Sequence, residues 1–180
     1  MGAAASVEFS RPVSLARAGA ASQAREIVAT PEERARLARR LGLVSLDRLS
    51  ARLAWRRQST GVIRLEGELE AAVTQSCVVT LEPVAAEVTE GFVRHFVRAA
   101  PAAEPEVVVD PEADDPPEPL GDGLVDLGEI VVQQLALARD PYPRAAGSTL
   151  PAALAGEPAV AEPADAEGPF RVLAGLKTEQ

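Results

Sequence analysis

The sequence predicts an α+β fold, in which two main helices cover an antiparallel β-sheet with a central hairpin. Two observations lead to this prediction. Apolar and polar residues alternate with a period of two over 45–57, 61–77 and 86–98, as they do in half-buried strands. Helix-start signals precede apolar residues with helical spacing in two other segments, 31–41 and 126–139.

Both predicted helices have clear local signals at their ends. In the first, Thr30 can cap the N-terminus, Pro31 suits the first helical position, and Gly42 is the expected end. In the second, Asp126 can act as the cap, with Glu129 at the third helical position, close to a capping box. The apolar stripe of this second helix is broad, so most of the helix should be buried.

A turn that ends at Gly61 joins the first two predicted strands into the central hairpin. A register that pairs Trp55 with Ile63 places apolar side chains opposite one another on one face. The same register places Arg52 opposite Glu66 on the other face. Because apolar packing and charge pairing agree, we predict this register for the hairpin.

A chain of 180 residues is long enough for about one domain. We expect a single α+β domain over 1–144, interrupted by a flexible acidic loop at about 100–120 that contains one short strand, 107–109. An Ala- and Pro-rich tail follows over 145–180, and its composition predicts disorder. The tail ends in a short apolar segment, 169–177, that can dock on the domain or meet a partner.

Charge is distributed unevenly along the chain. The net charge is −9, but residues 1–60 contain eleven arginines and only five acidic residues, whereas residues 61–180 have a net charge of −15. Such asymmetry is typical of a protein with a side that faces nucleic acid, or of two parts that neutralise each other in the fold. The negative total argues against strong non-specific binding to a phosphate backbone.

The inventory of reactive residues is small. One Cys and one His exclude a multi-Cys metal knuckle and a His-based metal triad. Cys77 falls on the apolar face of a predicted strand and is expected to be a buried core residue. The sequence therefore predicts no catalytic residue, no metal, no cofactor and no small-molecule substrate, and no apolar run is long enough to span a membrane.

Several short motifs follow one another in a characteristic order, and together they resemble the YceD family, the large ribosomal RNA subunit accumulation proteins, in the style of alphaproteobacterial members. The resemblance covers roughly Phe9 to Lys177. The motifs with the clearest sequence are Thr74-Gln75-Ser76-Cys77-Val78-Val79-Thr80-Leu81-Glu82-Pro83, Asp126-Leu127-Gly128-Glu129-Ile130, Asp140-Pro141-Tyr142-Pro143-Arg144 and Pro169-Phe170-Arg171-Val172-Leu173-Ala174-Gly175-Leu176-Lys177.

The resemblance implies a bacterial cytoplasmic protein with a role in the processing or accumulation of large-subunit ribosomal RNA, and hence in ribosome assembly. It implies no established catalytic activity. In some relatives the sequence at this place resembles a metal site, with a second Cys where this chain has Thr80. Because that second Cys is missing, we expect no zinc.

Two hypotheses about function follow. The leading one is a non-enzymatic factor that acts on large-subunit ribosomal RNA or a pre-ribosomal particle. Its candidate RNA contacts are arginines with no acidic residue opposite in the predicted register: Arg36, Arg39, Arg40 and Arg56. The alternative is an acidic adaptor that binds a basic ribosomal or assembly protein without direct RNA contact. Its candidate contacts, besides the acidic loop and the apolar C-terminal segment, are Asp140, Pro141, Tyr142, Pro143 and Arg144.

Overall fold

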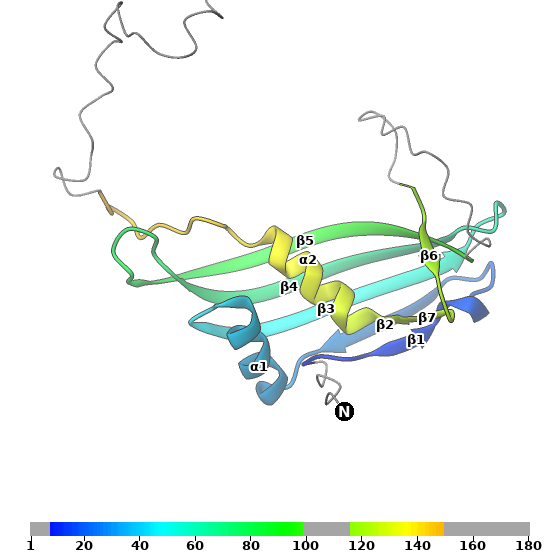
Figure 1. Ribbon diagram of the computed structural model, residues 1–180, viewed down its shortest axis with the longest axis horizontal. Coiled ribbons are helices and arrows are strands. Elements are labelled where there is room, and N and C mark those ends of the chain that lie inside the picture. Colours follow the sequence, from blue (N-terminus) through cyan, green and yellow to red (C-terminus); the bar gives the residue numbers. More distant parts are fainter. Residues whose placement is uncertain (1–7, 99–115, 150–180) are drawn as a thin grey trace, which may run out of the picture. The chain divides into compact units, whose positions relative to one another are not determined.

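A computed structural model describes residues 8–98 and 116–149 of the protein, and it confirms the α+β class (Figure 1). The predicted strand at 107–109 and the apolar segment 169–177 lie outside the described residues. The elements in chain order are β1 (Pro12–Ser14), the 3-10 turn η1 (Leu15–Arg17), β2 (Gln23–Val28), α1 (Pro31–Leu41), β3 (Ser45–Arg57), β4 (Ile63–Ser76), β5 (Pro83–Arg98), β6 (Glu118–Leu120), β7 (Leu124–Asp126) and α2 (Leu127–Ala138).

The strands form two sheets. The larger has five strands in the order β2-β3-β4-β5-β6, and the smaller pairs β1 with β7. All neighbours are antiparallel except β5 and β6, which are parallel. The prediction of an antiparallel sheet is therefore wrong at this edge. The connection over 99–117 is long enough for the chain to return and run in the direction of β5, as parallel pairing requires.

The register between β3 and β4 differs from the predicted one by two residues. Trp55 lies opposite Leu65 rather than Ile63, and Arg52 lies opposite Glu68. A shift of two residues leaves every side chain on the same face of the sheet, because successive residues of a strand alternate between faces. The alternation in the sequence is consistent with both registers, and the turn decides between them.

The β3–β4 turn is longer than the predicted one. The Gln58 N–H donates to the Val62 carbonyl oxygen over 2.8 Å, and Gly61 adopts φ +86°, which an L side chain rarely tolerates. The Arg57 guanidinium fixes this end of the hairpin by donating to the Gly61 and Ala18 carbonyl oxygens at 3.2 and 3.0 Å. This turn sets the observed register.

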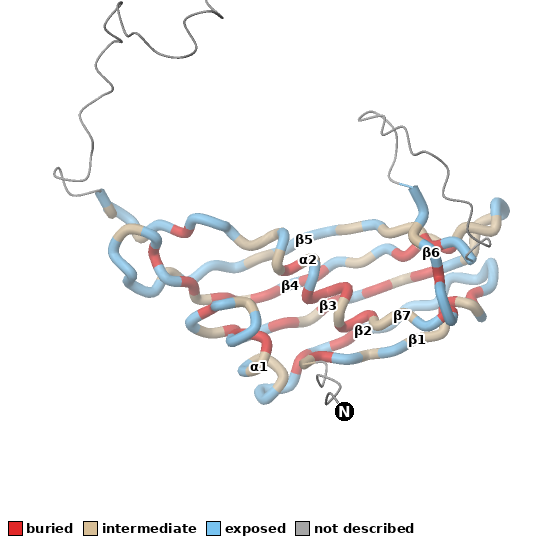
Figure 2. Tube along the Cα trace, viewed as in Figure 1, coloured by how far each residue is buried: buried red, intermediate tan, exposed pale blue. Residues whose placement is uncertain are grey.

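One face of the larger sheet is apolar, and the side chains of both helices join the same hydrophobic cluster. Figure 2 marks the buried residues along the strands and the two helices. In Figure 1, α2 runs obliquely across the sheet. The opposite face, which we call the polar face, carries charged residues at alternate positions of β3 and β4. The largest fully buried side chains are Phe9, Leu15, Leu37, Leu49, Leu53, Ile63, Leu65, Leu69, Val73, Leu127, Val131 and Leu135.

The helix ends follow the local signals in the sequence. Thr30 and Glu33 form a reciprocal capping box: the Glu33 N–H donates to Thr30 Oγ1, and the Thr30 N–H donates to the Glu33 carboxylate. Gly42 ends α1 in the left-handed region at φ +65°. At the start of α2, Asp126 is the N-cap. These three ends agree with the prediction.

Candidate functional site

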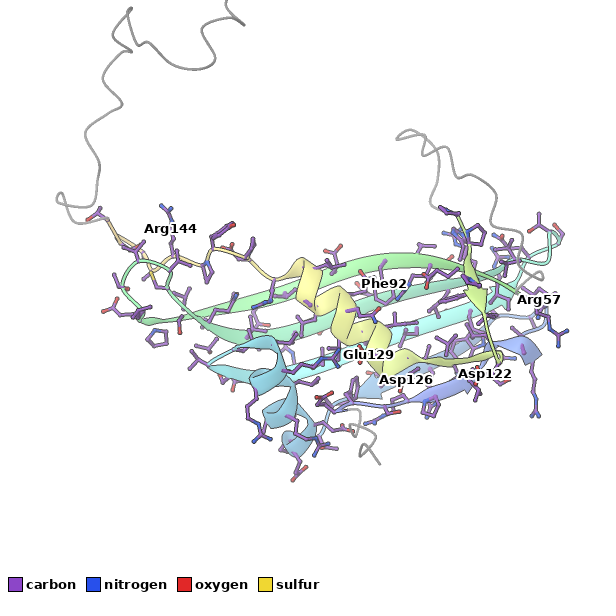
Figure 3. The ribbon with its side chains drawn as sticks, in the orientation of Figure 1. Arg57, Phe92, Asp122, Asp126, Glu129 and Arg144 are labelled. Atoms are coloured by element: carbon purple, nitrogen blue, oxygen red, sulfur yellow. The ribbon has the colours of Figure 1, made fainter. Side chains whose placement is uncertain are left out.

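Asp126 joins the start of α2 to the N-terminal segment (Figure 3). Its carboxylate accepts the N–H groups of Gly128 at 2.9 Å and Glu129 at 3.3 Å, which caps the helix. It also accepts the Arg11 N–H at 2.7 Å and the Ser10 hydroxyl. Burial raises the pKa of the Asp126 carboxyl, but these hydrogen bonds outweigh it and hold the pKa below its usual range.

Gly128 and Glu129, in the same motif, also make structural contacts. A Cβ at Gly128 would lie 2.2 Å from the Phe9 carbonyl oxygen, so only glycine permits this close approach. The Glu129 carboxylate binds both terminal nitrogens of Arg40, at 2.6 and 2.8 Å. This pair holds α2 to α1 and lowers the pKa of Glu129. The motif Asp126-Leu127-Gly128-Glu129 therefore locks α2 in place.

Two of the four candidate arginines already make ion pairs or hydrogen bonds within the protein. Arg40, which has no acidic residue opposite it in the predicted register, pairs with Glu129 at 2.6 Å and with Glu8 at 3.2 Å. Its partners are 89 and 32 residues away in the chain, so no strand register reveals them. Arg36 donates to the Glu8 carbonyl oxygen at 3.1 Å. Both side chains stabilise contacts between α1 and neighbouring segments.

The other two candidates, Arg39 and Arg56, are exposed. Arg39 borders a groove of about 370 Å³ between α1 and the start of β3. Part of the floor of this groove is apolar, formed by Ala38, Leu43 and Leu46. Arg39 thus remains available to a partner at the rim of an open groove.

Arg56 belongs to a row of basic side chains that the sequence does not reveal. The register places Arg56 beside Arg64 on β4, and Arg64 beside His95 on β5. We call Arg56 and Arg64 the cationic row, and His95 is the next residue across the sheet. Arg64 pairs with Glu66 on its own strand at 2.8 Å. Like charges opposite one another on adjacent strands repel, so an anion placed over the row would relieve the repulsion.

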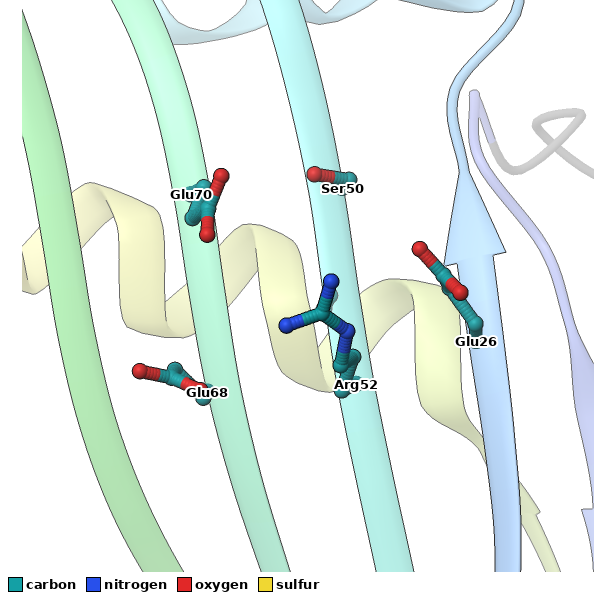
Figure 4. Close-up of a pocket in the computed structure, with 6 residues that line it drawn as sticks. Glu26, Ser50, Arg52, Glu68 and Glu70 are labelled. Carbon is teal, nitrogen blue, oxygen red and sulfur yellow. The ribbon is translucent and has the colours of Figure 1, made fainter.

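At the centre of the polar face, acidic side chains neutralise the charge of an arginine. Arg52 lies between Glu26 on β2 and Glu68 on β4, its direct neighbours in the register (Figure 4). Ser50 and Glu70 complete a small pocket of about 20 Å³. With two carboxylates beside it, Arg52 is a poor candidate for binding a phosphate group.

Cys77 is fully buried where β4 meets its turn. Its sulfur accepts the backbone N–H groups of Ala145 at 3.3 Å and of Thr80 and Val79 at 3.4 Å each. Hydrogen bonds from Ala145 and Thr80 lower the pKa of the thiol to about 6, against the effect of burial. The sulfur thus ties the segment after α2 to the β4–β5 turn.

The turn Asp140–Arg144 packs against the end of the sheet. The buried Gln75 side chain donates to the Asp140 carbonyl oxygen, and the Val78 N–H donates to the Pro143 carbonyl oxygen, at 2.8 and 2.9 Å. Pro143 is buried, whereas the other four residues of the turn are exposed. Tyr142 is 72% exposed and directs an apolar ring toward solvent. The exposed residues of this turn, which is the predicted contact for a partner protein, are therefore accessible from solvent.

The family model for "Large ribosomal RNA subunit accumulation protein YceD" matches residues 65–177. The chain belongs to the YceD family. The match confirms the family expected from the order of the motifs. Searches of curated proteins and of solved structures each gave no match.

In this YceD protein the matched range begins within β4. It includes β5, α2 and the Asp140–Arg144 turn, whereas Arg36, Arg39, Arg40 and Arg56 all precede it. None of the described helices has the length and apolar character needed to cross a membrane. The family name links YceD proteins to the accumulation of large-subunit ribosomal RNA.

Proposed function

We propose that this protein is a non-enzymatic cytoplasmic factor in the accumulation and processing of large-subunit ribosomal RNA. The family match over residues 65–177 carries the proposal. The contacts of the Asp126-Leu127-Gly128-Glu129 motif support it, because its polar groups are engaged in holding α2. A protein that acts by binding needs such a rigid platform more than it needs a reactive group.

The cationic row supports direct contact with the RNA backbone. The rings of Trp55, Phe92 and Phe96 lie on the apolar side of the sheet, so bases cannot stack on them from the polar face. Arginine contacts to phosphate need no aromatic platform and carry no sequence preference. RNA is then held at Arg56 by its phosphates, because Arg64 already pairs with Glu66.

A deletion strain tests the proposed function. The ratio of large- to small-subunit ribosomal RNA should fall in cells that lack the protein, and the intact gene should restore it. An unchanged ratio, with unchanged levels of large-subunit precursor, would refute the proposal.

The RNA contact has its own test in the purified full-length protein. Arg56→Ala should weaken binding to a large-subunit precursor fragment. It should also make the plot of log affinity against log salt concentration less steep, by the amount that corresponds to the loss of about one phosphate contact. Arg25→Ala is the control, because Arg25 is also an exposed arginine but lies on β2, outside the cationic row. Equal effects of the two substitutions would exclude a specific role of the row.

A pull-down from native lysate, with and without RNase, separates direct from indirect contact. Direct contact predicts that large-subunit ribosomal RNA and ribosomal proteins are recovered together and are both lost after RNase. Retention of one basic protein after RNase would contradict RNA as the primary contact.

A further inference from the structure

Helix α1 lies beside the beginning of β3 (Figure 1), and an open groove of about 370 Å³ runs between them. Strand β2 pairs with β3 only over Ser50–Trp55, so no described strand pairs with residues 45–47 on that side. The register with β4 also shifts between Leu46 and Arg48, which leaves Asp47 without a partner on β4. Such irregularities re-aim a side chain, and they are common beside functional sites. We call this space the α1–β3 groove.

The floor of the α1–β3 groove offers an apolar surface. Ala38, Leu43 and Leu46 form it, and Val44 beside them is 56% exposed. The lining residues Ala35 and Ala38 are three positions apart on α1, so they share a helical face, and their small side chains leave the groove open. A large apolar side chain placed here would cover Val44 and remove apolar surface from water, which is favourable.

The two walls of the groove carry opposite charges. Arg34 and Arg39 line it on the helix side, and Asp47 lines it on the strand side. Among the described residues neither arginine forms an ion pair, although Arg34 donates one N–H to the Ala29 carbonyl oxygen at 3.0 Å. The exposed Asp47 carboxylate accepts the Ser45 hydroxyl at 3.1 Å. The arginines can therefore donate charge-assisted hydrogen bonds, which are stronger than neutral ones, to the carboxylates of an occupant.

These features favour a protein segment over RNA as the occupant. A phosphate backbone would meet the Asp47 carboxylate, which repels it, and the described lining has no aromatic ring on which a base could stack. An amphipathic segment can satisfy the floor with an apolar side chain and the helix wall with carboxylates. Two arginines against one aspartate give the lining a net positive charge, so an acidic segment is the complementary one.

We propose that the α1–β3 groove binds a short segment of a partner protein in which a large apolar residue is flanked by glutamate or aspartate. The apolar side chain packs on the floor beside Val44, and the carboxylates pair with Arg34 and Arg39. The inference goes beyond the contact with RNA at Arg56, which lies at the other end of β3. It assigns Arg39 to a protein partner and makes the groove a second, separate binding surface.

The first test selects short peptides from a random displayed library on the full-length protein. The enriched peptides should share a leucine, isoleucine, methionine or phenylalanine with acidic residues next to it. A synthetic peptide of the enriched sequence should then bind in fluorescence anisotropy. Enrichment of basic peptides, or no enrichment above that on an unrelated protein, would overturn the inference.

Charge reversal locates the site. Arg39→Glu should weaken binding of the selected peptide at least about tenfold, and a peptide with lysine in place of its acidic residues should bind the Arg39→Glu variant more tightly than the native protein. A merely structural role of Arg39 does not produce this rescue. Arg25→Glu is the matched control, because Arg25 is also exposed but lies on β2, outside the groove. Equal effects of the two reversals would refute the assigned groove.

A second variant tests the apolar floor. Ala35→Phe fills the space between helix and strand and should weaken peptide binding at least about tenfold, whereas Ala85→Phe, at an exposed position of β5, should leave it unchanged. Because Ala35 is exposed, the larger side chain should leave the fold intact, which circular dichroism checks. Unchanged affinity of Ala35→Phe would mean binding by charge alone and would contradict the proposal.

Methyl NMR signals distinguish the other occupants. Those of Val44 and Leu46 should shift when the selected peptide is added. A shift of the same signals on dilution of the free protein would assign the groove to a second copy of the chain. A shift with a large-subunit precursor fragment that Arg39→Glu abolishes, and Arg56→Ala does not, would assign it to RNA. Either result overturns the inference, while the ribosomal RNA ratio of the deletion strain tests the proposed function separately.

Discussion

Replacement of Asp126 by alanine should destabilise the protein by about 2–4 kcal/mol. The loss of an N-cap costs about 1 kcal/mol. The Arg11 N–H, which donates to Asp126 over 2.7 Å in a half-buried position, loses its acceptor, and an unsatisfied buried donor costs about 1–3 kcal/mol. The sum is a large part of the 5–15 kcal/mol that is typical of a domain.

Urea unfolding followed by circular dichroism measures this loss. Asp122→Ala is a suitable control, because Asp122 lies just before β7 and its exposed carboxylate accepts one N–H, that of Leu124, at 3.0 Å. We expect a loss below about 1 kcal/mol for the control. Equal losses in both variants would refute the inference that Asp126 holds the N-terminal segment to α2.

Three further substitutions or conditions test the packing and electrostatics. Gly67→Ala places a Cβ 2.3 Å from the Phe92 ring and should cost about 1–3 kcal/mol in thermal unfolding, whereas Gly91→Ala, with no heavy atom within 4 Å of the added Cβ, should change little. Cys77→Ala leaves three N–H groups without an acceptor and should be less stable than Cys77→Ser, whose hydroxyl oxygen still accepts, when both are compared by urea midpoint. Because the pKa of Asp126 is lowered in the folded state, its stabilisation is present above its unfolded value and is lost as the pH falls below about 4. The urea midpoint should therefore fall less on acidification in Asp126→Asn than in the native protein, and equal falls would contradict this.

The helices were predictable because their signals are local. Thr30 and Glu33 are three residues apart, and their side chains complete each other's hydrogen bonds within one turn. Asp126 caps α2 by accepting the N–H groups of Gly128 and Glu129, two and three residues away. In each case the residues that decide the boundary are neighbours in the sequence, so no knowledge of the fold is needed.

The strands were predictable only in part. The sequence pattern identifies the faces of β3 and β4 but not their register, because a shift of two residues preserves both faces. The strand β2 was not predicted, since Ile27 is the only buried residue among its six. Three-residue strands such as β6 are too short for a period of two to be visible, and their pairing depends on distant parts of the chain.

The candidate site shows the same division between local and distant information. Arg40 and Arg56 look alike in the sequence, yet the fold brings Glu129 to one and Arg64 to the other. One arginine becomes a structural ion pair and the other joins a row of like charges. The charge of a neighbour 89 residues away therefore decides which arginine stays a candidate for contact with RNA.

An open strand edge is less visible still in a sequence. Its binding groups are backbone N–H and C=O, which every residue except proline provides in the same way. Motif searches detect side chains, so they find Asp126 and Gly128, which hold α2 in place, and they miss the edge of β5 that this helix borders.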